Sequence, residues 1–163
     1  MSEEQKQHLE FIQNTITRMN TNSFQIKEWC ITIVAALLAL YAANDKLLFL
    51  IIGFFPTILF WSLDSYYLQQ ERKFRGIYNN VIGLENTVEI KLYEMPIQKF
   101  NGGKYCFWNS FFSKTIIRFY LIIILSLVIL TLGISFKGIQ NQVHQDSANT
   151  ETVINNAGGN INE

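Results

Sequence analysis

The chain has 163 residues, of which 49% are hydrophobic, and its 13 basic and 13 acidic residues cancel to a formal net charge of zero. That neutral balance argues against a protein that binds polyanions over its whole surface. The apolar residues are concentrated in three runs with the charges between them, a segregation that a soluble globular domain does not need. We therefore expect an integral membrane protein.

The three apolar runs cover residues 24–43, 47–63 and 116–136. A helix rises about 1.5 Å per residue, so each run is long enough to cross most or all of a hydrocarbon core about 30 Å thick. None shows the polar and apolar alternation of a barrel strand. The predicted fold is an all-α membrane protein with three transmembrane helices, and a lipid bilayer is the first expected partner.

Residues 1–22 are predicted to form a cytoplasmic amphipathic helix. Ser2 and Gln5 have the spacing of a capping box, and apolar residues follow at helical spacing. This stripe needs a partner, which we expect to be another cytoplasmic part of the chain or a neighbouring subunit; the membrane surface is the alternative. Its members are Leu9, Phe11, Ile12, Ile16 and Met19.

Residues 23–64 are expected to form an antiparallel transmembrane hairpin, with Pro56 at a kink or close contact in the second span. Small residues recur along the first span, and such residues let membrane helices approach closely. They predict a face that packs against protein or lines a pore, although alanine is also simply a common helix former. The face comprises Thr32, Ala35, Ala36, Ala39 and Ala43.

Three ionisable residues lie at one level where the hairpin meets the inner interface: Lys27, Glu28 and Asp64. Ionisable groups at membrane depth pair with one another or serve a function. Lys27 and Asp64 are the predicted pair. Such a pair anchors the hairpin, and in an oligomer the same charges would ring the inner mouth of a pore.

Residues 65–115 are predicted to be a cytoplasmic region. The second helix should continue to about residue 80, residues 88–92 alternate as in a short strand, and the aromatic residues at 105–112 suggest an interfacial helix. After the third span at 116–136, residues 137–163 are rich in Asn and Gln. We expect them to form a disordered external tail.

Orientation follows from the basic residues, because most flank the N-terminal segment or lie between the second and third spans. The positive-inside bias puts the N-terminus and the middle region in the cytoplasm and the C-terminus outside. No cleavable signal peptide is evident. Cys30 and Cys106 are expected to be reduced thiols.

The motifs sought for catalysis, phosphate cradling and metal binding are not found, so the protein is not expected to be an enzyme or to need a cofactor or metal. Three spans are too few to enclose an aqueous path, so a pore would require a homo-oligomer lined by one span from each subunit. The first span is the predicted lining helix. A transporter is a rival class, but neither repeated halves nor polar midplane residues are visible.

Two stretches carry a family resemblance: FIQNTITRMNTNSFQIKEWCITIVAALLALYA at 11–42 and FFPTILFWSLDSYYLQQERKFRGIYNNV at 54–81. They resemble small bacterial membrane proteins encoded beside nucleotidyltransferases in anti-phage loci. The cytoplasmic helix, membrane hairpin and second cytoplasmic helix are similar to the two-span SLATT effectors, from which the third span departs. The whole layout most resembles the membrane effectors of the Hailong defence system.

This resemblance implies a homo-oligomeric channel, for example a tetramer, in the bacterial inner membrane. A nucleotide or oligonucleotide made by a partner nucleotidyltransferase would gate it, and opening would depolarise an infected cell in abortive infection. If such a ligand binds, its phosphates need cations. The alternative is that the basic residues between the second and third spans only enforce the membrane topology. The rival is a non-conducting scaffold or partner subunit for a cytoplasmic enzyme. The candidate ligand-binding cations are Arg72, Lys73, Arg75, Lys99 and Lys104.

Overall fold

The computed structural model describes the backbone of residues 2–159 and the side chains of residues 2–137 and 140. Within these residues the fold is all-helical and contains no strand. Its elements are α1 (Glu3–Asn44), α2 (Leu48–Val81), the short 3₁₀ turns η1 (Ile97–Lys99) and η2 (Gly103–Tyr105), α3 (Phe107–Phe111) and α4 (Lys114–Gly159). Three stretches, Glu3–Asn44, Leu48–Val81 and Lys114–Lys137, are long and apolar enough to cross a membrane.

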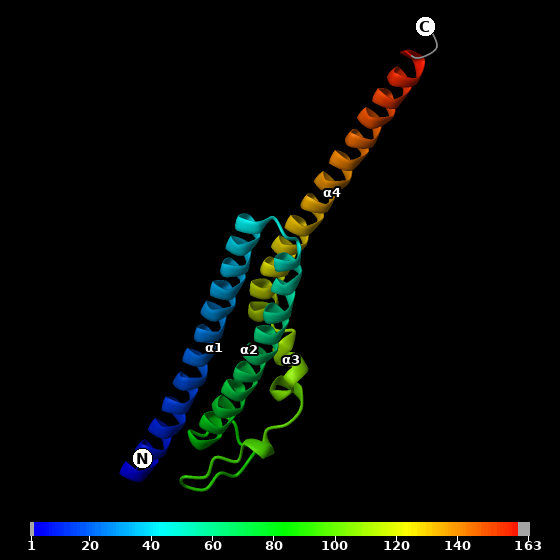
Figure 1. Cartoon of the computed structure of the whole chain (residues 1–163). Coiled ribbons are helices and arrows are strands. Elements are labelled where there is room, and N and C mark those ends of the chain that lie inside the picture. Colours follow the sequence, from blue (N-terminus) through cyan, green and yellow to red (C-terminus); the bar gives the residue numbers. More distant parts are fainter. Residues whose placement is uncertain (1, 160–163) are drawn as a thin grey trace.

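Helices α1 and α2 form an antiparallel pair joined by a tight turn (Figure 1). Asp45 adopts a left-handed conformation at this turn, and its N–H donates to the Tyr41 carbonyl at 2.8 Å. At the other end of α1, the predicted capping box is confirmed: Ser2 N–H donates to the Gln5 side chain and Gln5 N–H donates to the Ser2 hydroxyl. The predicted N-terminal helix and first span are therefore one continuous helix.

One seam runs along almost the whole of α1 and faces α2. Its buried residues recur at helical spacing in each half of the helix, and Met19 and Ser23, which are partly buried, bridge the interval between the halves. The apolar stripe predicted within residues 1–22 is thus covered by another part of the same chain. Phe11 is the exception, because it lies outside this seam and is 47% exposed. The buried members are His8, Ile12, Ile16, Ile26, Cys30 and Val34.

Two hydrophobic clusters hold the fold together. The first joins α1, α2 and α4 in the apolar half of the molecule, where Leu127 of α4 lies against Gly53 of α2. The second joins the N-terminal part of α1, the C-terminal part of α2 and the segment 82–113 that follows it. We call this second region the polar end; it comprises residues 3–22 and 65–113. Because α1 and α2 each run through both clusters, no flexible linker separates the polar end from the apolar half.

Helix α4 packs along α2 and then extends well beyond the hairpin turn (Figure 1). It reaches Gly159, so the structure differs from the disordered tail predicted for residues 137–163; residues 160–163 lie outside the described residues. The Asn and Gln content argued against a packed core. It does not prevent a helix that has already formed from continuing, because nucleation is the costly step and no proline occurs between 137 and 159.

The strand predicted at 88–92 is wrong. Val88 and Ile90 pack against the cluster of the polar end, so the alternation reflects one buried side of an irregular segment, and within the described chain no strand pairs with it. The Asn80 side chain instead fixes this segment, because its oxygen accepts from the N–H groups of Thr87 and Val88, each at 2.9 Å. The predicted interfacial helix corresponds to the short α3.

Candidate functional site

The predicted pairing of Lys27 with Asp64 is present at the centre of the seam between α1 and α2. The Lys27 ammonium lies 2.6 Å from one oxygen of Asp64, whose side chain is fully buried, whereas the Lys27 side chain remains 20% exposed. The Ser23 hydroxyl donates to the other Asp64 oxygen and accepts from Lys27 at 2.7 Å. We call these three residues the latch.

Ser23 is the member of the latch that the sequence reading missed. It precedes Lys27 by four residues and so lies on the same face of α1, one turn away. A hydroxyl one turn from a lysine at a span entrance was therefore a usable signal. The third predicted charge, Glu28, is exposed and takes no part in the latch, because one residue along a helix rotates the side chain by about 100°.

Aromatic packing from α4 and α3 fixes α2 beside the latch. The Tyr120 hydroxyl donates to the Phe60 carbonyl at 3.2 Å, one turn from Asp64. The Trp61 ring stacks against Phe111 and Tyr120 at centroid distances of 4.6 and 5.9 Å, and its indole N–H donates to the Phe111 carbonyl. The latch is consequently surrounded by well-packed groups on the α2 side.

The predicted small-residue face of α1 is uncovered in the protomer. With about 100° between successive residues, its members lie roughly opposite the seam formed by Cys30 and Val34. All five are exposed, so neither α2 nor α4 packs against them. We call this set the alanine face: Thr32, Ala35, Ala36, Ala39 and Ala43.

Two of the five predicted ligand-binding cations, Lys99 and Lys104, line the same hollow of about 370 Å³ at the polar end. Both are paired with carboxylates, Lys99 with Glu94 at 3.4 Å and Lys104 with Glu85 at 2.9 Å. The hydrogen bond from Lys104 lowers the pKa of the Glu85 carboxyl, and the same bond raises the pKa of Lys104. The pKa of Glu94 is also lowered, chiefly by the Lys91 backbone N–H.

The other three predicted cations lie on α2 and do not converge on this hollow. Arg72 fastens the segment before α4, donating to the Lys104 carbonyl and to side chains of residues 109, 110 and 113 at 3.0–3.4 Å. Arg75 pairs with Glu71, one turn earlier on α2, at 2.8 Å. Lys73 is partly buried. The structure therefore brings together two of the five.

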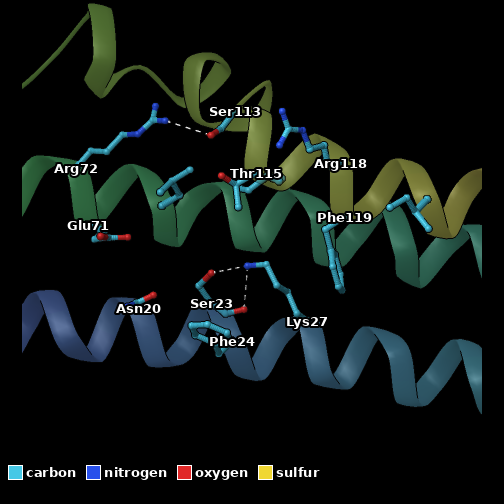
Figure 2. Close-up of a pocket in the computed structure, with 13 residues that line it drawn as sticks. Asn20, Ser23, Phe24, Lys27, Glu71, Arg72, Ser113, Thr115, Arg118 and Phe119 are labelled. Atoms are coloured by element: carbon cyan, nitrogen blue, oxygen red, sulfur yellow. Dashed lines mark hydrogen bonds between the residues drawn. The ribbon is translucent and has the colours of Figure 1, made fainter.

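A larger cleft of about 760 Å³ lies where the polar end meets the apolar half. Figure 2 shows Ser23 and Lys27 on α1 across from Thr115 and Arg118 on α4, with α2 between them. The cleft exists because α1 and α4 each pack on α2, whereas their backbones do not approach one another within the described residues. Sequence reading did not anticipate it, since it depends on where α4 docks.

Comparison of the chain with protein-family models, curated proteins and solved structures finds no match.

Proposed function

We propose that the protein is a homo-oligomeric channel of the bacterial inner membrane that acts as an effector of anti-phage abortive infection. The observation that carries this proposal is the uncovered alanine face of α1. Lipid gives no hydrophobic reason to cover an apolar helix, so small residues on one face favour contact with another helix. Three spans cannot enclose water alone, and a second copy of the chain supplies the missing wall.

The continuity of α1 supports gating from the polar end. The same helix carries the seam of the polar end, the latch residues Ser23 and Lys27, and the alanine face. A displacement of the polar end is therefore transmitted along a rigid element rather than absorbed by a loop. In this proposal the N-terminus and the polar end are cytoplasmic and the end of α4 is periplasmic, in agreement with the distribution of Lys and Arg.

The proposed signal is a nucleotide or oligonucleotide from a partner nucleotidyltransferase, and the hollow with Lys99 and Lys104 is its proposed site. Phosphate oxygens suit these ammonium groups, and the neighbouring Tyr105 ring offers a surface on which a base could stack. Glu85 and Glu94 occupy the two lysines, so a phosphate would have to displace them. Ligand binding would thereby release the 82–105 segment from its own ion pairs.

A second candidate function is a non-conducting scaffold for a cytoplasmic enzyme. It is favoured by apolar side chains exposed at the polar end, among them Leu84 at 74%, Phe11 at 47% and Tyr93 at 46%. Phe11 and Tyr93 lie together, with ring centroids 6.3 Å apart, and exposed apolar groups that cluster on a surface mark protein interaction sites.

Conductance of the purified oligomer in planar bilayers distinguishes the two functions. A channel gives discrete current steps that candidate nucleotides change. Absence of current in every oligomeric preparation, with and without nucleotides, would refute the channel and favour the scaffold.

Ala39→Leu tests the alanine face directly. Crowding a close helix contact costs about 1–3 kcal/mol, which corresponds to a loss of roughly five- to 150-fold in association constant. We expect the oligomer mass in detergent to fall, measured by light scattering after size exclusion. Ala42→Leu is the matched control, because it adds the same groups at an exposed position in the last turn of α1, about 60° round the helix from Ala39 and beside the hairpin turn. Equal oligomer masses for Ala39→Leu and the unaltered protein would refute the proposal that the alanine face is the contact between subunits.

A further inference from the structure

The cleft between α1 and α4 combines charged and apolar walls at one depth of the molecule. Its polar side carries the cations Lys27, Arg72 and Arg118 and a single carboxylate, Glu71, that is already paired with Arg75. Its apolar side is formed by aromatic and aliphatic groups that include Phe24 and Phe119. This arrangement matches a ligand with an anionic head and an apolar body.

Two cations of the cleft, Arg72 and Arg118, have no carboxylate partner among the described residues, and only Arg118 makes no side-chain hydrogen bond there. Lys27 is neutralised by Asp64, and the Arg72 guanidinium donates to acceptors before α4. Arg118 is exposed, and in the described part of the chain it makes no ion pair. An arginine one turn into an apolar helix extends its charged group towards the interface while its stem lies on apolar surface. Its five donors suit the bidentate recognition of a phosphate.

The depth of the cleft identifies the source of that phosphate. It lies at the level of the latch, where α1 and α4 begin their apolar runs, at Phe24 and Ile116, and where α2 ends its run at Leu63. If the three apolar helices cross a bilayer, this level is the headgroup layer of one leaflet. Basic pockets between transmembrane helices at this level bind anionic lipid headgroups.

We propose that this cleft is a binding site for an anionic phospholipid of the leaflet next to the polar end, with phosphatidylglycerol as the probe. Arg118 binds the phosphate, Lys27 and the Thr115 hydroxyl flank the headgroup, and the acyl chains leave along Phe119 and Phe24. The cleft volume of about 760 Å³ lies within the range of small-ligand sites, and its open side leaves the chain ends in the bilayer. The lipid would fill the space that separates α1 from α4 and so couple the two helices.

Native mass spectrometry of the full chain in detergent tests this site by titration with phosphatidylglycerol and, separately, with phosphatidylcholine. We expect phosphatidylglycerol to bind the unaltered protein more tightly. Arg118→Gln should weaken that binding about tenfold, because it removes a charge-assisted contact. The matched control is Lys114→Gln, which removes an exposed charge one turn earlier on α4, outside the cleft, and should change binding less than twofold.

Thr115→Trp provides a second variant that leaves the charge unchanged and fills the cleft. It should reduce phosphatidylglycerol binding as strongly as Arg118→Gln, while elution volume and helical circular dichroism report that each variant is folded. Equal affinity for both lipids, equal losses in Arg118→Gln and Lys114→Gln, or full binding by Thr115→Trp would each overturn the proposal. Displacement of the lipid by millimolar inorganic phosphate or by a dinucleotide would also overturn it, because the site would then recognise a soluble phosphate. None of these outcomes depends on channel activity.

Discussion

Removing the charge of Lys27 and removing the charge of Asp64 should each destabilise the protein, but by different amounts. Breaking a buried ion pair by removing one partner costs about 3–5 kcal/mol, because the remaining charge has no compensation. In Lys27→Met the fully buried Asp64 keeps only the Ser23 hydroxyl, so the cost should lie near the upper end, about 5 kcal/mol. In Asp64→Asn the ammonium keeps the Ser23 hydroxyl and 20% of its exposure, so about 3 kcal/mol is expected.

The double variant Lys27→Met with Asp64→Asn distinguishes the attraction between the two charges from the cost of leaving one of them buried alone. It leaves no buried charge, and the new amide can still accept from Ser23, so it should be more stable than Lys27→Met alone by about 2 kcal/mol. Lys6→Met is the control, because Lys6 pairs with Glu3 at an exposed site where an ion pair is worth at most about 1 kcal/mol.

The assay is the free energy of unfolding in mild detergent, followed by tryptophan emission across a denaturant titration. Trp61, which stacks on Phe111 one turn before Asp64, contributes to this emission together with Trp29 and Trp108, so the signal follows unfolding of the whole chain. Additive losses in the double variant, or a loss in Lys27→Met no larger than in Lys6→Met, would refute the description of the latch as a buried and coupled pair.

Two further predictions concern the polar end. A Cβ added at Gly76 would lie 2.8 Å from the Phe100 ring, so Gly76→Ala should destabilise this region by about 1–3 kcal/mol. Gly133 lies in open space, so Gly133→Ala is the control and should not destabilise the protein. Thermal unfolding measures both variants. The pKa of Glu85 is lowered in the folded state, so its contribution should be complete above the unfolded value of about 4.3 and be lost as the pH falls below it. The hydrogen-exchange protection factors of residues 82–105 should fall as the pH drops below about 4.3 in the unaltered protein, and Lys104→Gln should reduce this fall to the part that Glu94 contributes; an equal fall in Lys104→Gln would contradict the assignment.

The helices and the Lys27–Asp64 pair could be predicted because they depend on local pattern. Apolar runs of sufficient length specify helices in lipid whatever the tertiary fold, and the Ser2 and Gln5 spacing specifies where α1 begins. Lys27 and Asp64 could be paired because a hairpin with a short turn brings residues equally far from that turn to one level. Each inference needed only the register of one helix against its chain neighbour.

The features that could not be predicted depend on which segments meet across long separations. The 88–92 alternation is typical of a strand, yet a strand needs a partner, and here the apolar residues face α1 and α2 instead. Arg72 looked available for a ligand, but its acceptors lie more than thirty residues away in the segment before α4. The cleft likewise arises from the docking of α4 on α2, and its residues come from three helices.

The position of the latch bears on the choice between channel and scaffold. It lies between the two hydrophobic clusters, with Lys27 on α1 and Asp64 on α2, so α1 cannot slide along α2 without separating Lys27 from Asp64. Separation of a buried pair is costly, and a device that resists such motion is useful only where motion has a consequence. A scaffold needs a stable docking surface and no transmission through α1. In the channel proposed above, the alanine face lies on the same helix as Ser23 and Lys27, so the cost of separating Lys27 from Asp64 would set a threshold between the closed and open states.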